Sequence, residues 1–305
     1  MAKSIFVIGN NRSGTKWISN LLLGHPDIAG IQSPNHKGIL ETGLLTAFPE
    51  IFGSLMNSDS RIGCIECFAA TDYFRLTGLD KDVLYRFPVD NYYAFFRALM
   101  DRLADERGAG WWLQKFSPIV LPDLMRHFPE ARFVMITRDM IPTIRSNMIM
   151  AGDPPRWRSA IRHLFWYHYG IRQMRAYRNR PGVLGIRYET LLAEPEKTVR
   201  WLCRELGLDF TPTLLETRFL RNHIAGSGDM SNSFLRHIRC LSAPFALMPL
   251  WVFRGIHRCH RSFKRRRSPF LQTTFSIVAS QRGLTGTAVR GETQTALTNE
   301  KGRSD

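Results

Sequence analysis

The most constraining feature of the sequence is a short apolar run near the N-terminus that passes directly into a glycine-flanked loop. Residues 5–17 read Ile-Phe-Val-Ile-Gly-Asn-Asn-Arg-Ser-Gly-Thr-Lys-Trp. An apolar run rich in β-branched residues is typical of a buried strand. Consecutive N–H groups in the loop that follows, together with the positive end of a helix, bind a phosphate or sulfate. The segment therefore predicts an α/β sheet that holds an anion at the end of its first strand.

Five apolar runs in all are predicted to be buried strands, and helical patterns separate them. The predicted strands are residues 4–8, 28–32, 111–115, 132–137 and 183–188. The predicted helices are residues 14–23, 91–107, 118–128 and 195–206. Because strands and helices alternate, the fold class is expected to be α/β, with a mainly parallel central sheet and helices on both of its faces.

Basic residues are concentrated at the C-terminal end of the chain. The net charge is +16, and residues 236–305 contribute 13 Lys and Arg against 3 Asp and Glu. This placement argues against a general nucleic-acid-binding coat and fits a region that meets an anionic surface. Residues 236–267 are predicted to form a basic, partly apolar helical extension, and residues 268–305 a polar, disordered tail. Within this region, residues 244–267 either lie on an anionic membrane or form a core helix followed by solvated charges.

The remaining sequence signals favour a cytoplasmic protein, with peripheral membrane contact left open. The first apolar run stops at Gly9, too early for a secretory signal. No stretch reaches the roughly 18 consecutive apolar residues of a spanning helix. Five scattered cysteines are no disulfide framework. Residues 156–180 hold seven Arg, interleaved aromatic residues and no acidic residue. They contact nucleic acid, line an anionic acceptor site as an amphipathic helix, or form a packed helix with a solvated Arg face, which is the plainest of the three interpretations.

The N-terminal loop differs from that of a P-loop kinase in the residues that handle metal and γ-phosphate. Gly9 and Gly14 have the spacing of GxxxxGK[ST], but Thr15 stands in the lysine position and no Gly-Lys-Ser/Thr follows. The hydroxyl that would hold Mg²⁺ is therefore missing. A donor with a single anionic group and no metal fits the loop better.

The same residues carry a family resemblance. Residues 12–17, Arg-Ser-Gly-Thr-Lys-Trp, and residues 22–27, Leu-Leu-Gly-His-Pro-Asp, resemble the RSGTTW…HPD opening of sulfotransferases that use 3′-phosphoadenosine 5′-phosphosulfate (PAPS). The resemblance implies a P-loop-NTPase-like three-layer sandwich, and a loop that holds the 5′-phosphosulfate while Trp17 stacks on adenine. The implied loop residues are Arg12, Ser13, Gly14, Thr15 and Lys16. Lys16 departs from the family's usual Thr, and its ammonium either replaces a lysine found earlier in the loop of other members or points to solvent.

A second strand-to-helix junction, residues 128–146, carries a second part of the resemblance. Arg138 stands at the end of a predicted strand, where open α/β sheets bind ligands, and Ser146 follows in the next helix. An Arg fork and a hydroxyl can bind a dianionic phosphate. The segment resembles the family's FP(D/E)A(R/K)FI…RDP…S pattern, which implies that Arg138 and Ser146 hold the 3′-phosphate of PAPS. A weaker match at residues 185–195 places Tyr188 beside the adenine, with a tyrosine on a strand edge as the alternative.

Transfer to an acceptor requires neutralisation of the leaving oxygen and removal of the acceptor's proton. Lys115 either neutralises the leaving oxygen or is a solvated lysine at a strand end. The histidine that acts as the base in cytosolic members of the family is absent from this chain. Golgi-type members use a Glu after the second strand, where this chain offers His36 and Glu41. Glu41 is the first candidate base because an enclosed carboxylate can have a raised pKa. His36 is the second because the ordinary pKa of imidazole already suits the task. A solvated loop residue is the alternative for each.

Together these features predict a sulfotransferase domain over residues 1–235. It would move a sulfuryl group from PAPS to a hydroxyl or amine acceptor, such as a glycan, a lipid or a small metabolite. No metal is required. The alternatives are a P-loop nucleotide-dependent kinase, and a non-catalytic protein that binds a nucleotide or a membrane.

Overall fold

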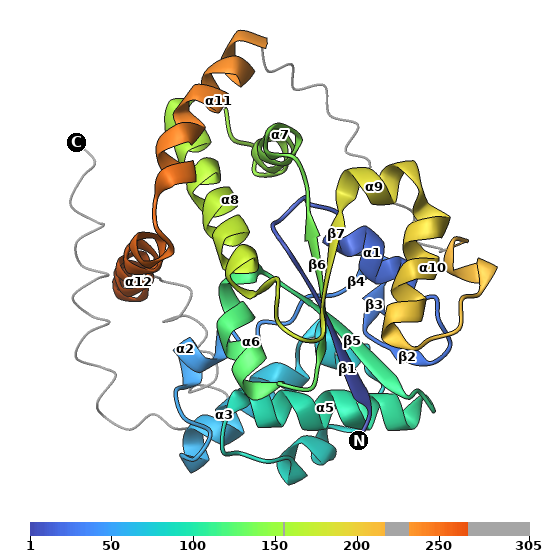
Figure 1. The fold of residues 1–305 in the computed structure, drawn as a ribbon. Coiled ribbons are helices and arrows are strands. Elements are labelled where there is room, and N and C mark those ends of the chain that lie inside the picture. The colour runs from blue at the N-terminus through green and yellow to red at the C-terminus, as the bar shows by residue number, and fades with distance from the viewer. Residues whose placement is uncertain (155, 217–231, 268–305) are drawn as a thin grey trace, which may run out of the picture.

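The computed structural model describes residues 1–154, 156–216 and 232–267. Its centre is a sheet of five parallel strands in the order β2-β5-β1-β6-β7 (Figure 1). The strands are β1 (Lys3–Gly9), β2 (Ile28–Ala29), β5 (Trp111–Phe116), β6 (Arg132–Thr137) and β7 (Val183–Arg187). Two short strands, β3 (Gln32–Ser33) and β4 (Gly38–Ile39), pair antiparallel beside it. The predicted α/β fold with a parallel sheet is confirmed.

The two faces of the sheet are covered by different helices, because side chains alternate between the faces along each strand. On one face, Ile5 and Val7 pack with α1 (Thr15–Leu22) and α10 (Pro195–Leu206). On the other face, Phe6 and Ile8 pack with other helices, chiefly α5 (Tyr92–Glu106), α6 (Leu121–His127) and α3 (Ser58–Ala69). Every strand residue in β1 after Lys3 is buried. The three layers of the predicted sandwich are therefore present (Figure 1).

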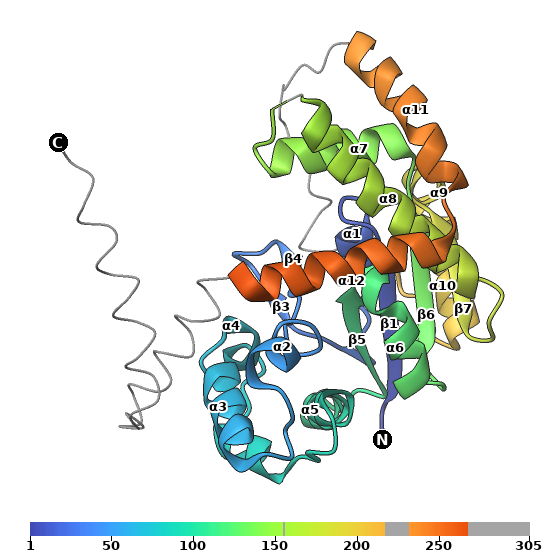
Figure 2. The same ribbon diagram turned by 90° about the vertical axis from the view of Figure 1, so that its left-hand side faces the viewer.

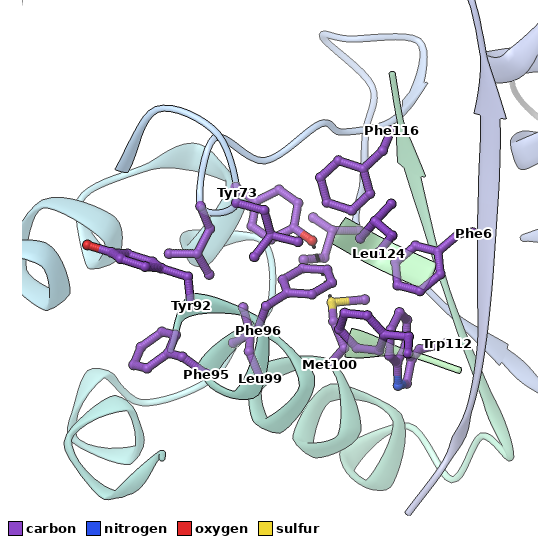
Figure 3. Packing of buried hydrophobic residues seen from close by; sticks show 14 of the residues in the cluster. Phe6, Tyr73, Tyr92, Phe95, Phe96, Leu99, Met100, Trp112, Phe116 and Leu124 are labelled. Atoms are coloured by element: carbon purple, nitrogen blue, oxygen red, sulfur yellow. Dashed lines mark hydrogen bonds between the residues drawn. The ribbon is translucent and has the colours of Figure 1, made fainter. Parts of the chain in front are cut away.

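An aromatic cluster forms the larger of the two cores. The ring of Phe6 lies 5.3 Å from Trp112 and 4.9 Å from Phe128, both edge-on, and 5.4 Å from Phe133 in a stacked arrangement. Edge-to-face and offset geometries are the favourable ones for aromatic pairs. Figure 3 shows Phe6, Trp112 and Phe116 together with Phe95, Phe96 and Met100 of α5. This packing fixes β1, and so fixes the position of the loop that follows it.

The remaining elements surround this centre. They are α2 (Phe48–Phe52), α4 (Asp72–Arg75), η1 (Lys81–Arg86), η2 (Pro118–Val120), α7 (Met140–Met150), α8 (Trp157–Tyr177), α9 (Tyr188–Ala193), η3 (Pro212–Leu214), α11 (Asn232–Leu247) and α12 (Leu250–Arg267). No helix in the described part of the chain is long and apolar enough to span a bilayer.

Three predicted elements differ in detail from the structure. The helix predicted over residues 118–128 is a 3-10 turn, η2, followed by α6. The predicted strand 28–32 is split, because β2 pairs with β5 for two residues only and the chain then leaves the sheet for the β3–β4 pair. Tyr188 begins α9 instead of ending β7. This places the Tyr188 side chain at the mouth of the sheet, next to the loop after β1.

The two C-terminal helices pack against α8. Ile238 of α11 and Phe253 of α12 are fully buried, and the Phe253 ring stacks on Tyr169 at 5.8 Å. Figure 2 shows α12 crossing in front of α8 toward α2. The boundary predicted at residue 236 falls inside α11, and the division into three segments stays a prediction. The tail predicted over residues 268–305 lies outside the described residues.

A buried histidine makes this packing sensitive to acid. His168 of α8 is 3.1 Å from the Ser242 hydroxyl of α11, and burial, aided by the charges of Arg172 and Arg175, lowers the pKa of His168 from 6.5 to about 4. Because the folded pKa lies below the unfolded one, folding favours the neutral ring. Stability is therefore expected to be intact above pH 6.5 and to fall as the pH drops toward 4.

Urea unfolding at pH 7 and pH 5 measures this effect. The pH-dependent loss of stability is expected to be smaller in His168→Gln, which cannot gain a proton. An equal loss in the variant and the wild type would contradict the assignment to His168.

Candidate functional site

The loop after β1 is held in a conformation that few side chains tolerate. Arg12 has a φ of 67° and Gly14 a φ of 97°, both in the left-handed region. The Ser13 hydroxyl donates to the Asn10 carbonyl at 2.7 Å and closes the turn. A Cβ on Gly14 would overlap the ring of Tyr188, so only glycine fits between the loop and α9. The sequence therefore fixes a tight loop against the first turn of α9.

This geometry leaves the start of α1 available to an anion. The Ser13 amide donates to the Asn10 carbonyl at 3.1 Å, and the Ile18 amide donates to the Gly14 carbonyl at 3.1 Å. The first turn of a helix has no carbonyls of its own for its N–H groups, and the helix dipole makes this end positive. The segment from Gly14 to Lys16 is thus arranged as an anion-binding loop.

The two strand-to-helix junctions meet directly. The Arg138 guanidinium donates to the Arg12 carbonyl at 2.9 Å, and Arg12 Nε donates to the Ser146 hydroxyl at 2.9 Å. Burial lowers the pKa of Arg12, and the nearby charge of Arg138 lowers that pKa further. Two guanidinium groups that oppose each other's charge favour the binding of an anion between them.

Aromatic rings lie next to these cations. The Arg138 guanidinium carbon is 4.3 Å from the centre of the Tyr188 ring, and the Trp17 ring meets Tyr188 edge-on at 5.9 Å. Trp17 and Tyr188 are half-buried, and each leaves part of its ring at the site. An aromatic surface beside paired cations suits a nucleoside that carries phosphate groups.

Both junctions line one cavity with a volume of about 620 Å³. Its wall carries the cations Arg12, Lys16, Lys115, Arg138 and Arg162, and Glu41 is the one carboxylate among the described residues that line it. Its wall further includes Gly14, Thr15, Trp17, Ser117, Asn147, Met150, His163, Trp166, Tyr167 and Tyr188. The volume is in the usual range of ligand sites, and the excess of cations fits a polyanion.

The three candidate catalytic residues have different surroundings in the structure. Lys115, whose side chain is 8% exposed, forms an ion pair with Glu41 at the cavity wall. His36 is exposed and lines a smaller neighbouring cavity of about 310 Å³, which it shares with Lys16 and Glu41. Lys16 Nζ donates to the His36 backbone carbonyl at 2.6 Å, which joins the β3–β4 loop to the anion-binding loop.

Lys16 is partly buried and lines the cavity, so its ammonium is not fully hydrated. Burial lowers the pKa of Lys16, the charge of Lys115 lowers it further, and Glu41 opposes the shift. Two ammonium groups near one carboxylate give this part of the cavity an excess of positive charge. A negatively charged ligand would relieve that excess.

Several cavity residues were missed by the sequence analysis because they act through the backbone or come from α8. Asn147 donates to the Asn11 carbonyl at 3.2 Å, and the Tyr167 hydroxyl donates to the Arg138 carbonyl at 2.9 Å. His163 also lines the cavity. The one sequence signal for α8 was the arginine-rich, aromatic stretch 156–180, for which a role in an acceptor site was one of three interpretations.

Comparisons with known proteins identify sulfotransferases as the proteins to which this chain is similar. A family model described as "Sulfotransferase family" matches residues 4–212. The sulfotransferase domain of the Synechococcus PCC 7002 olefin synthase is 18% identical, with a TM-score of 0.51, over 82% of this chain and 89% of that one. This likeness supports the fold.

Two further solved structures are more distant. The sulfotransferase domain from the curacin biosynthetic pathway is 18% identical, with a TM-score of 0.48, over 73% of this chain and 81% of its own. Mouse sulfotransferase SULT7A1, solved in complex with PAP, is 12% identical, with a TM-score of 0.46, over 85% of this chain and 89% of its own. The comparison with curated proteins found no match. Because the family model covers well over half of the 305 residues, the chain belongs to the sulfotransferase family.

Proposed function

We propose that the 620 Å³ cavity binds PAPS and transfers its sulfuryl group to a hydroxyl or amine acceptor. The observation that carries the proposal is the hydrogen bond from Arg138 to the Arg12 carbonyl, at 2.9 Å. It brings the two anion-binding motifs, which are 126 residues apart in the chain, to one cavity. One doubly phosphorylated nucleotide can therefore reach both.

Each part of PAPS has matching residues. The loop residues Arg12, Ser13, Gly14, Thr15 and Lys16 are proposed to hold the 5′-phosphosulfate. Arg138 and Ser146 are proposed to hold the 3′-phosphate, with the Ser146 hydroxyl free to donate because it accepts from Arg12. Trp17 and Tyr188 are proposed to contact the adenine. The cavity lining supports this placement for Arg12, Gly14, Thr15, Lys16, Trp17, Arg138 and Tyr188, whereas Ser13 and Ser146 are not among the described residues that line it.

When bound, PAPS supplies a sulfuryl group attached to a stable leaving group, the nucleotide adenosine 3′,5′-bisphosphate (PAP). The chain's own part is to position the acceptor and to stabilise the charge that develops on the leaving oxygen. Lys16 and Lys115 are proposed to neutralise that charge, since both line the cavity close to Glu41. Glu41 and His36 stay candidates for removal of the acceptor's proton. Glycans, lipids and small metabolites are the proposed acceptor classes.

Calorimetry with PAP and a turnover assay with PAPS test the proposed function. Binding of PAP without any divalent metal is expected, followed by PAP release from PAPS in the presence of an acceptor. Mg²⁺-dependent turnover of ATP would instead support the kinase alternative. Binding of PAP without transfer to any acceptor in a broad panel would indicate a non-catalytic nucleotide-binding protein.

Substitution of Lys115 by Met is expected to slow transfer without comparable loss of nucleotide binding. The variant keeps much of the side-chain volume but removes the ammonium at the leaving oxygen, and loss of such a group typically costs about 10²–10³ in kcat. Single-turnover rates and PAP calorimetry on the same preparation separate the two effects. Lys81→Met is the control, because Lys81 forms an ion pair with Glu66 on the surface. Unchanged turnover in Lys115→Met would contradict the proposed role.

We further propose that α11 and α12 contact an anionic membrane. Leu247 and Trp251, at the turn between the helices, are 81% and 73% exposed. Residues 232–267 carry nine Lys and Arg and no acidic residue. Arg258 lies seven positions after Trp251 on α12 and is exposed, so both share one helix face. An exposed tryptophan next to basic residues is typical of a helix at a lipid surface.

Co-sedimentation with vesicles tests this contact. The protein is expected to bind vesicles that contain phosphatidylglycerol and not pure phosphatidylcholine vesicles, and Leu247→Ser with Trp251→Ser is expected to reduce binding several-fold. Met56→Ser is the control for loss of an exposed apolar side chain elsewhere. Equal sedimentation of wild type and double variant would contradict the proposal, as would binding to nucleic acid in place of lipid.

A further inference from the structure

The cavity wall formed by α8 contains a histidine that the proposed mechanism does not use. His163 Nε2 lies 2.8 Å from Asp153 Oδ2, in the segment between α7 and α8, and the two side chains are 14% and 17% exposed. Arg162 forms a second ion pair with the same carboxylate. Figure 2 shows α7 and α8 side by side at this end of the molecule. His163 is therefore held by a carboxylate while it faces the cavity.

The partner of His163 determines which ring nitrogen is free. Hydrogen bonds from Arg162 and His163 keep the pKa of Asp153 below its ordinary value, so Asp153 is ionised and can only accept. The Nε2 atom of a neutral His163 must then carry the proton that bonds Asp153. Its Nδ1 atom keeps a lone pair and can accept a proton.

Glu41 is less suited to accept a proton than its position suggests. Its carboxylate is paired with Lys115, whose side chain is only 8% exposed. Protonation of Glu41 would leave a nearly buried ammonium without its counter-ion, which is unfavourable. Protonation of His163 has the opposite effect, because the imidazolium would form a stronger bond with Asp153. His36 is exposed and lines the neighbouring cavity instead.

We propose that His163 is the base that deprotonates the acceptor, with Asp153 as its positioning residue. The inference rests on the proposed sulfotransferase function. The acceptor's O–H bond breaks and its proton moves to His163 Nδ1, while the acceptor oxygen forms a bond to sulfur. The bond between sulfur and the 5′-phosphate oxygen breaks, and its electron pair leaves with PAP.

Asp153 is proposed to assist His163 through their direct contact. In the step above, its carboxylate would stabilise the imidazolium that forms, while Arg162 on the same helix pairs with the same carboxylate. Asp153→Asn removes that carboxylate. The variant is therefore expected to slow transfer to weakly acidic acceptors more than transfer to acidic ones, with PAP binding unchanged.

The decisive experiment compares acceptors of different acidity. PAP release from PAPS is measured with a series of phenols from unsubstituted phenol to 4-nitrophenol, for the wild type, His163→Gln and Glu41→Gln. His163→Gln is expected to lose roughly 100-fold or more with phenol, the usual scale for a general base. The loss is expected to shrink with 4-nitrophenol, which ionises without help. The loss in Glu41→Gln is expected to be the same for all acceptors.

Controls separate this inference from the proposed function. PAP binding by calorimetry is expected to be unchanged in His163→Gln, which also shows that the variant folds. His127→Gln, whose ring stacks on Tyr93 away from the cavity, is expected to behave like the wild type. A loss in His163→Gln that does not vary with acceptor acidity would overturn the inference, and so would an acidity-dependent loss in Glu41→Gln. A wild type that binds PAP but releases none from PAPS with any acceptor of a broad panel, phenols included, would overturn the proposed function itself.

Discussion

Replacement of Arg138 by alanine is expected to weaken the binding of PAP by at least roughly 100-fold, since hydrogen bonds to charged groups contribute about 1.5–3 kcal/mol each. Two effects combine. The variant loses a guanidinium that is proposed to hold the 3′-phosphate. It also loses the hydrogen bond to the Arg12 carbonyl and the contact with the Tyr188 ring, which brace the anion-binding loop. Titration calorimetry with PAP measures the change.

The control for Arg138 is an arginine of similar chemistry outside the cavity. Arg126 is largely exposed, and its guanidinium lies 3.7 Å from the Asp123 carboxylate at the surface. Because it does not line the cavity, Arg126→Ala is expected to bind PAP like the wild type. Equal affinities of Arg138→Ala and wild type would show that the nucleotide lies elsewhere. If neither protein bound PAP, the assignment of the whole pocket would be wrong.

Substitution of Gly14 by alanine is expected to abolish PAP binding and to lower the melting temperature. The left-handed conformation costs a non-glycine residue about 1–2 kcal/mol. The added Cβ would also overlap the Tyr188 ring, so the loop or the start of α9 must move. Either movement displaces the first-turn amides of α1 or the aromatic side of the proposed adenine site. Thermal denaturation and calorimetry report the two losses.

Gly78 provides a matched control for this variant. It has a φ of 75°, also in the left-handed region, but a Cβ there would have no atom of the described residues within 4 Å other than those of its chain neighbours. Gly78→Ala therefore has the conformational cost without the overlap. It is expected to lower the melting temperature less and to keep PAP binding. If Gly14→Ala bound PAP as well as Gly78→Ala, the close fit between loop and Tyr188 would have no functional role.

The sheet could be predicted from sequence because its strands are buried on both faces. A parallel strand covered by helices on each side is a nearly continuous apolar run, and β1 and β6 have that form. The prediction of a strand at residues 28–32 was only half right. Its sequence is equally apolar, but its two-residue pairing with β5 depends on where the chain leaves the sheet. Tertiary contacts, and not local composition, determine the residue at which the chain leaves the sheet.

The candidate site was predictable where residues follow a strand directly. Arg12 and Arg138 come from the ends of neighbouring strands, so their proximity follows from the sheet order. The pairing of Glu41 with Lys115 joins residues 74 positions apart, and no local pattern connects them. His163 was not identified, because the bond to Asp153 exists only once α8 has packed beside α7. Sequence spacing alone does not encode such packing.

The long helix α12 has a consequence for how the enzyme can diversify. Arg261 of α12 pairs with Glu50 of α2, and the rings of His257 and His260 lie 5.5 Å and 5.9 Å from Trp166 of the cavity wall. The family model ends at residue 212, before this helix begins. A segment outside the region matched by the family model thus backs one wall of the pocket, while the loops proposed to bind the donor lie within that region. Replacement of this segment is therefore expected to alter the pocket wall near Trp166 and to leave the loops after β1 and β6 in place.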